Sequence, residues 1–210
     1  MIIPEDTPTL GRVSPAGPAG QVGLAIDRHR TALFIVDVQE RLCAAMAKKS
    51  LRRMRKNLAV LIEMARRFAM PIVVSQQYPK GLGSTLPVIE DALAGYEHVH
   101  RFDKVDFSAC EAESFAVVRD AVDDDHDVWI VTGMETHICV YQTARSLAAQ
   151  GEVVHVPRDA VLSRSKDDWR VGLELIGRAG GIVTSTETVL FDVLRRAGTD
   201  DFKALSALVK

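Results

Sequence analysis

Short apolar runs, each closed by a polar residue, recur along the chain and predict the strands of a sheet. They occupy residues 31–36, 71–75, 97–100, 128–132, 153–156 and 181–184, and the third run is the weakest pattern. Their β-branched residues favour extended backbone, and few polar residues alternate with the apolar ones. Strands that are apolar on both faces are typical of a parallel sheet that helices cover on either side.

Helical periodicity fills the intervals between these runs. Residues 50–69 place apolar side chains at helical spacing, and the arginines between them are most simply a solvated face. A second helix is expected at 136–150, where Gly151 supplies a stop, and a third at 166–179, where Ser165 begins a capping box.

The alternation of strands and helices predicts the architecture. It implies right-handed crossovers within one α/β domain. We predict a three-layer α/β/α domain with a mostly parallel, six-stranded, Rossmann-like sheet and helices on both faces. The active site of such a sheet lies beyond the carboxyl ends of its strands, where the strand order reverses. Residues 1–22, rich in Pro and Gly, are expected to form an arm, and residues 23–210 the domain.

Composition and charge narrow the class of protein. The chain has 210 residues, 47% of them apolar, which suits one domain with a substantial core. A net charge of -2 provides no broad positive field, so a nucleic-acid partner is not expected. The sequence shows neither a secretory leader pattern nor an apolar run long enough to cross a bilayer. We therefore expect a cytoplasmic protein without membrane association.

Three cysteines, Cys43, Cys110 and Cys139, are too few and too scattered for a disulfide framework or a zinc site, which favours reduced thiols. Cys139 follows the fourth predicted strand, in the opening turn of a helix. Free N–H groups and the helix macrodipole favour a thiolate there and predict a lowered thiol pKa. Packing as a small apolar residue is the alternative, and it is our interpretation of Cys43 and Cys110.

The residues just before Cys139 have less specific explanations. His137 stands two positions earlier and points to another side of the helix, so we interpret it as a capping or surface residue. Glu135 and Thr136 suit the start of a helix, and both can equally line a pocket.

Two further strand ends carry polar residues. Asp37 ends the first strand and is either a helix N-cap or a general base. Gln39 presents its amide to a substrate or merely begins the next helix. Lys104 follows the weak third strand between Asp103 and Asp106, where a surface salt bridge is the simplest explanation.

Together these segments resemble the isochorismatase-like cysteine hydrolases. The stretches that carry the resemblance are 33–39 (LFIVDVQ), 104–108 (KVDFS) and 131–140 (VTGMETHICV). Stretches 77–85, 159–165 and 186–191 are most similar to the subgroup called isochorismatase domain-containing proteins.

The resemblance implies a catalytic Asp–Lys–Cys triad at Asp37, Lys104 and Cys139. It also implies a non-proline cis peptide between Met134 and Glu135, and an oxyanion hole formed by backbone N–H groups of Glu135 and Cys139. The same three residues stand at strand ends, where the sheet argument places an active site.

One departure from the family narrows the substrate. Nicotinamidases of this superfamily carry an Asp-x-His metal motif after the second strand, but this chain reads Ser-Gln-Gln-Tyr-Pro at 75–79. We therefore predict no metal and no cofactor, and we expect Gln39, Gln77, Tyr78 and Thr136 to contact substrate. A retained cysteine favours C–N cleavage of a small amide or ureide through a thioester. Vinyl ether hydrolysis and a non-catalytic thiol redox sensor are the alternatives. The resemblance also implies a homo-oligomer, either a dimer or a tetramer.

Overall fold

The computed structural model describes residues 24–122 and 125–209, so the predicted arm at 1–22 lies outside the described residues. The strands within the described part are β1 Thr31–Val36, β2 Ile72–Gln77, β3 Val99–Lys104, β4 Val128–Met134, β5 Val153–Pro157, β6 Val161–Leu162 and β7 Ile182–Thr184. The α-helices are α1 Glu40–Ala44, α2 Lys48–Arg67, α3 Pro79–Leu82, α4 Pro87–Leu93, α5 Glu113–Val122, α6 Tyr141–Ala149, α7 Lys166–Arg178, α8 Thr186–Leu194 and α9 Asp200–Ser206. Shorter helical turns are η1 Ala109–Glu111, η2 Thr136–Val140 and η3 Ala207–Val209.

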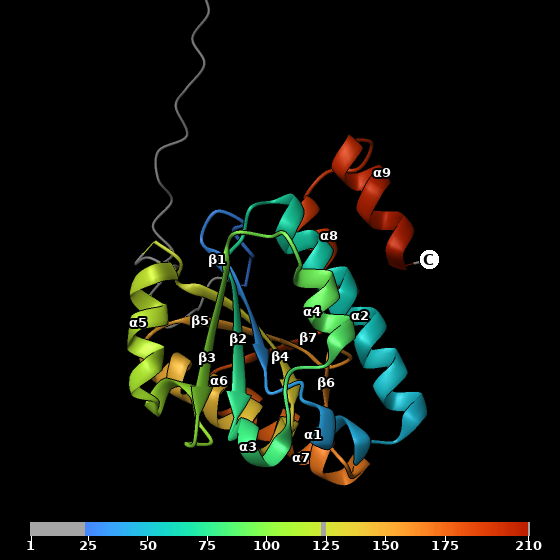
Figure 1. Ribbon diagram of the computed structural model, residues 1–210. Coiled ribbons are helices and arrows are strands. Elements are labelled where there is room, and N and C mark those ends of the chain that lie inside the picture. Colours follow the sequence, from blue (N-terminus) through green and yellow to red (C-terminus); the bar gives the residue numbers. More distant parts are fainter. Residues whose placement is uncertain (1–23, 123–124, 210) are drawn as a thin grey trace, which may run out of the picture.

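The strands form one parallel sheet in the order β3-β2-β1-β4-β5-β7, with β6 paired to β4 (Figure 1). Strand order reverses between β1 and β4, which run side by side from Thr31↔Val128 to Val36↔Gly133. A crevice at the carboxyl ends of β1 and β4 is therefore the expected place for a ligand. The predicted fold class is confirmed, and the sheet contains β6 in addition to the six predicted strands.

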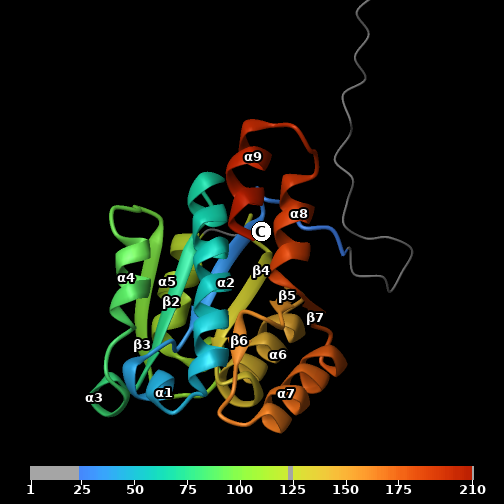
Figure 2. The same cartoon turned by 90° about the vertical axis from the view of Figure 1, so that its right-hand side faces the viewer.

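Two helical layers bury the sheet from opposite sides. Helices α2, α4, α8 and α9 cover one face, and α5, α6 and α7 cover the other (Figures 1 and 2). Strand β1 alternates between the two layers: Leu33 and Ile35 pack toward α2, whereas Phe34 packs toward α5 beside Phe115. All six residues of β1 are fully buried, which explains why its sequence shows no polar alternation.

The sequence-based boundaries differ from the structure in two instructive places. The weak third strand was expected at 97–100, but β3 spans Val99–Lys104 and exposes alternate residues because it lies at the sheet edge. The helix expected at 136–150 begins as the π-helical turn η2, which continues into α6. This wider turn carries Cys139.

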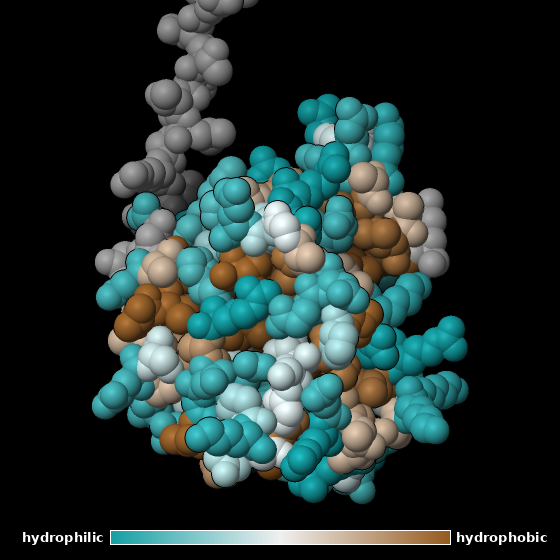
Figure 3. Space-filling view, in the orientation of Figure 1, coloured by the Kyte–Doolittle hydropathy of each residue, from teal (hydrophilic) through white to brown (hydrophobic). Residues whose placement is uncertain are grey.

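The face seen in Figure 3 mixes charged and apolar side chains, as on most globular proteins. None of the helices among the described residues is long and apolar enough to cross a membrane.

Candidate active site

Asp37 and Lys104 form a buried ion pair at the carboxyl ends of β1 and β3. Lys104 Nζ lies 2.8 Å from Asp37 Oδ2, and neither side chain is exposed to solvent. The surface salt bridge that spacing alone favoured for Lys104 is therefore not what the structure shows. Desolvating two charges is costly unless further hydrogen bonds compensate, so the surroundings of this pair matter.

Polar groups surround the Lys104 ammonium on several sides. Nζ donates to Gln77 Oε1 at 2.7 Å and to the backbone carbonyl of Asp106 at 3.1 Å. The carbonyl of Phe107 lies at 3.4 Å. Gln77 is itself fixed, because its Nε2 donates to the carbonyl of Val105 at 2.7 Å. These acceptors hold the ammonium in one position against the carboxylate of Asp37.

The carboxylate of Asp37 has a second donor on its other oxygen. Ser75 Oγ, near the end of β2, donates to Asp37 Oδ1 at 2.8 Å. Both oxygens are thus engaged, one by a hydroxyl and one by an ammonium. Ser75 was not among the predicted site residues, although its place at the end of a predicted strand was a usable signal.

Cys139 lies in η2, with only 5% of its surface exposed. Burial raises the pKa of its thiol to about 12, the negative charge of Asp37 adds to this increase, and Lys104 opposes it. The predicted lowering of the pKa at a helix start is therefore wrong for the resting structure, because burial and the negative charge of Asp37 outweigh the positive charge of Lys104. The thiol is protonated at neutral pH, and a neighbouring base must remove its proton before it can react.

The backbone around Cys139 is held from several directions. The Met134–Glu135 peptide bond is cis, as the resemblance implies. The Glu135 carbonyl accepts from the N–H groups of Ile138 and Val140. Arg164 clamps the Glu135 carboxylate through its Nε, at 3.0 Å, and through its backbone N–H, at 3.0 Å. This ion pair holds the Glu135 side chain in place and so fixes the residue that precedes the turn η2.

Helix α7 packs against the same turn through Gly172. A Cβ at this position would meet His137 N and Thr136 C at 2.7 Å. Only a glycine permits this close approach. No sequence pattern indicated a role for Arg164 or Gly172, because their contacts depend on how the segment between β6 and α7, and α7 itself, pack against η2.

The four predicted substrate contacts have different surroundings. Gln39 is fully buried, and its Nε2 donates to the carbonyls of Gln77 and Gly83. Its Oε1 accepts from Gln77 N, so Gln39 ties strand ends together and its amide has no remaining donor for a substrate. Tyr78 is 54% exposed in a left-handed conformation beside the Lys104 backbone. Thr136 is fully buried, and its Oγ1 has no hydrogen-bond partner among the described residues.

His137 and the two other cysteines take up separate positions. His137 is half-buried, and its Nδ1 lies 3.0 Å from Ser163 Oγ. Cys43 Sγ lies 3.8 Å from Met134 Sδ, and Cys110 Sγ lies 3.9 Å from the Thr143 carbonyl. Burial raises the pKa of Cys43 to about 11 and that of Cys110 to about 12. Both behave as packed thiols.

No cluster of three or more His, Cys, Asp or Glu residues suited to a metal occurs within residues 24–122 and 125–209.

The fold and this site define an α/β/α protein with a buried cysteine beside an Asp–Lys pair at the switch point of its sheet. The sequence profile of the isochorismatase domain matches residues 31–188. The chain therefore belongs to the isochorismatase family, a family of hydrolases.

Individual relatives agree with this assignment. The chain is 33% identical over 182 residues to the secreted isochorismatase effector Isc1 of Phytophthora sojae, covering 87% of this chain and 85% of that protein. It is 30% identical to isochorismatase domain-containing protein 2 of Bos taurus, covering 97% and 88%. Among solved structures, the MAR1 ribonuclease of Caenorhabditis elegans is 32% identical with a TM-score of 0.78, covering 88% and 92%.

Proposed function

We propose that this protein is a metal-independent cysteine hydrolase that cleaves the C–N bond of a small amide or ureide through a thioester. The observation that carries the proposal is the buried Asp37–Lys104 pair beside the equally buried Cys139. A protonated thiol needs a base, and Asp37 is the carboxylate whose charge acts on it most strongly.

In the first step, Asp37 accepts the thiol proton and the Cys139 sulfur attacks the substrate carbonyl. Lys104 offsets the negative charge that moves between carboxylate and sulfur. Backbone N–H groups of Glu135 and Cys139 stabilise the tetrahedral oxyanion. The C–N bond then breaks, and the amine leaves with the proton that Asp37 held.

In the second step, water hydrolyses the thioester. Asp37 takes a proton from the water, the hydroxide attacks the acyl carbon, and the C–S bond breaks. The released thiolate recovers the proton from Asp37, so the resting state is regenerated. Each proton moves between Asp37 and a reacting atom.

Of the predicted substrate contacts, Tyr78 and Thr136 remain available to bind a substrate. The Tyr78 side chain is exposed, and the Thr136 hydroxyl is buried three residues before Cys139 in η2. Gln77 serves indirectly, because its amide oxygen positions Lys104. A homo-oligomer remains a prediction. A reducing, cytoplasmic location also remains a prediction, and it suits a chemistry that requires a free thiol.

A panel of primary amides, N-carbamoyl amino acids and ureides tests this function. Acid-quenched turnover mixtures analysed by intact mass should show an acyl adduct on the wild type with at least one substrate. The adduct and the turnover should vanish in Cys139→Ala and persist in Cys110→Ala, a matched control with a similarly packed thiol.

Other outcomes distinguish the competing functions. Turnover that survives in Cys139→Ala would exclude the thioester. Cleavage of a vinyl ether without any amide turnover would indicate the isochorismatase reaction. Reversible sulfenic acid on Cys139 without turnover would favour a redox sensor. The name of the C. elegans relative makes RNA a necessary arm, and cleavage of a single-stranded RNA in place of any amide would overturn the proposal.

A further inference from the structure

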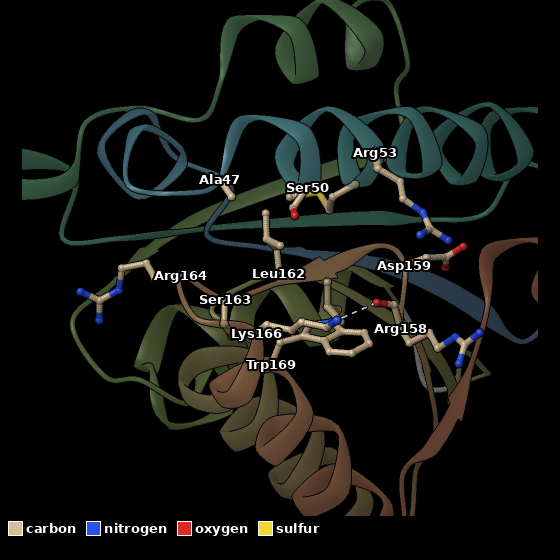
Figure 4. A pocket seen from close by; sticks show the side chains of 12 residues that line it. Ala47, Ser50, Arg53, Arg158, Asp159, Leu162, Ser163, Arg164, Lys166 and Trp169 are labelled. Carbon is tan, nitrogen blue, oxygen red and sulfur yellow. Dashed lines mark hydrogen bonds between the residues drawn. The ribbon is translucent and has the colours of Figure 1, made fainter.

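A cavity of about 680 Å³ opens between the first turns of α2 and the start of α7 (Figure 4). Ser50 and Arg53 line it from α2, Leu162 from β6, and Lys166 and Trp169 from α7. We call it the α2–α7 cavity. Its size is within the range of small-molecule sites. Asp37, Lys104 and Cys139 are not among the residues that line it.

The charge of the cavity lining is positive. Arg53, Arg158 and Lys166 are exposed, and none of their side chains has a hydrogen-bond or ion-pair partner within the described parts of the chain. Asp159 is the carboxylate in the lining, and its Oδ1 already accepts from the N–H and hydroxyl of Thr186. A chain with a net charge of -2 thus concentrates cations here without pairing them.

Apolar and aromatic surface lies between these cations. The half-buried indole of Trp169 is fixed in place because its Nε1 donates to the Arg158 carbonyl at 3.1 Å. Leu162 of β6 also lines the cavity, and its side chain points toward α2 in Figure 4, whereas Val161 packs in the same apolar cluster as Trp169. In the same view Arg164 turns away from the cavity, consistent with its ion pair to Glu135.

We propose that the α2–α7 cavity is a second ligand site, which binds a small organic anion with a planar apolar body. The ring lies against the indole of Trp169, and the anionic group faces Arg53 and Lys166. Fixed aromatic surface with a few polar groups at its edge is the common composition of small-molecule pockets. A carboxylate, a sulfonate or a phosphate ester can each be the anionic group of such a ligand.

The α2–α7 cavity is connected to the turn that carries Cys139, but it is a separate site. Strand β6, which lines the cavity, pairs with Gly133 and Met134 of β4. Ser163, the next residue, contacts His137. The two sites are therefore connected through the neighbouring strands β4 and β6 but have different linings.

Heavy-atom quenching of tryptophan fluorescence tests the proposal with 4-iodobenzoate as probe. The chain has two tryptophans, and Trp129 is fully buried, so quenching should report Trp169. We expect saturable quenching that is lost in Trp169→Phe and retained in Cys139→Ala. The neutral analogue 4-iodobenzyl alcohol should bind at least five-fold more weakly.

Charge variants locate the anionic group. The double variant Arg53→Gln/Lys166→Gln should weaken 4-iodobenzoate binding about ten-fold, because each exposed cation contributes a modest, screened attraction. Arg52→Gln, a matched control on the same helix outside the cavity, should change binding less than two-fold.

Three results would overturn the proposal. The first is the absence of saturable quenching at millimolar probe, and the second is equal affinity for the neutral analogue. The third is loss of binding in Cys139→Ala, which would place the probe in the other site. These measurements need no turnover, so a failure of the proposed hydrolase does not affect them.

Discussion

Cationic side chains near the carboxyl edge of the sheet have opposite surroundings: one is buried and paired, and the others are exposed and unpaired among the described residues. Lys104 is 4% exposed, and its ammonium is surrounded by Asp37, Gln77 and backbone carbonyls. Arg53 and Lys166 are exposed at the α2–α7 cavity, where no described residue pairs with them. The comparison separates a charge that is built into the structure from charges that are available to a ligand.

The difference has an energetic consequence. Removing one partner of a buried pair leaves the other charged and desolvated, whereas removing an exposed cation leaves nothing unsatisfied. Single-residue variants test this contrast between buried and exposed charges, from the largest expected effect to the smallest.

Lys104→Met should lower the free energy of unfolding by about 3–5 kcal/mol, because it leaves Asp37 buried without its partner. The matched control Lys166→Met removes an exposed lysine and should stay within about 0.5 kcal/mol of wild type. Urea denaturation measures both. Equal effects of the two variants would contradict the contrast between buried and exposed cations.

His155 is a buried ionisable group that remains uncharged instead of being paired. It is 3% exposed, its Nε2 has no hydrogen-bond partner among the described residues, and burial lowers its pKa to about 4. The unfolded chain, with a histidine pKa near 6.5, binds the proton first, so stability falls as the pH drops from about 6.5 toward 4. The contribution of His155 to this loss should reach roughly 3 kcal/mol at pH 4.

Urea denaturation at pH 7 and pH 4 measures this loss in wild type and in His155→Gln. The variant should lose less stability over that interval, because glutamine takes up no proton. An identical pH dependence in both proteins would show that His155 titrates normally.

Gly172→Ala should displace the turn that carries Cys139. The added methyl would lie 2.7 Å from His137 N, and overpacking of this kind costs about 1–3 kcal/mol. Turnover should fall with stability, since the displaced atoms adjoin the nucleophile. Gly177→Ala, on the same helix with nothing within 4 Å of its Cβ, should retain activity and gain up to about 1 kcal/mol. Full activity in Gly172→Ala would show that the turn does not depend on this contact.

Ser75→Ala should have the smallest effect of the four. It removes one donor from Asp37 and leaves the Lys104 contact in place. A hydrogen bond to a charged group contributes about 1.5 kcal/mol or more, so kcat should fall roughly ten-fold with little change in KM. Ser75→Thr, which keeps the hydroxyl, should retain most of the rate. Loss in both variants would indicate a steric effect at β2.

The sequence predicted the sheet well where strands are buried on both faces. Strand β1 is buried throughout and is apolar after Thr31, and so its boundaries were recovered in full. Strand β3 lies at an edge and carries polar residues, so its pattern was weak and the prediction stopped at residue 100. Strand β6 has only two residues, too few for any periodicity.

The candidate site was predictable where it depends on strand ends, and unpredictable where it depends on packing. Asp37 and Lys104 end β1 and β3, and Cys139 lies in the turn after β4, so topology brings them to one edge. The ion pair of Arg164 with Glu135 depends on the segment between β6 and α7, and the close approach of Gly172 depends on the position of α7, and no local pattern encodes either. The thiol pKa was predicted with the wrong sign because burial is a property of the whole fold.

The rate at which iodoacetamide alkylates Cys139 at pH 7 tests the central claim most directly. Removing the charge of Asp37 should lower the thiol pKa, since that charge raises it. If thiolate population alone governed reactivity, Asp37→Asn would react faster. Our account makes Asp37 the base, so alkylation of Cys139 in Asp37→Asn should be at least ten-fold slower, with Cys110 unchanged as internal reference. An equal or faster rate in Asp37→Asn would contradict it.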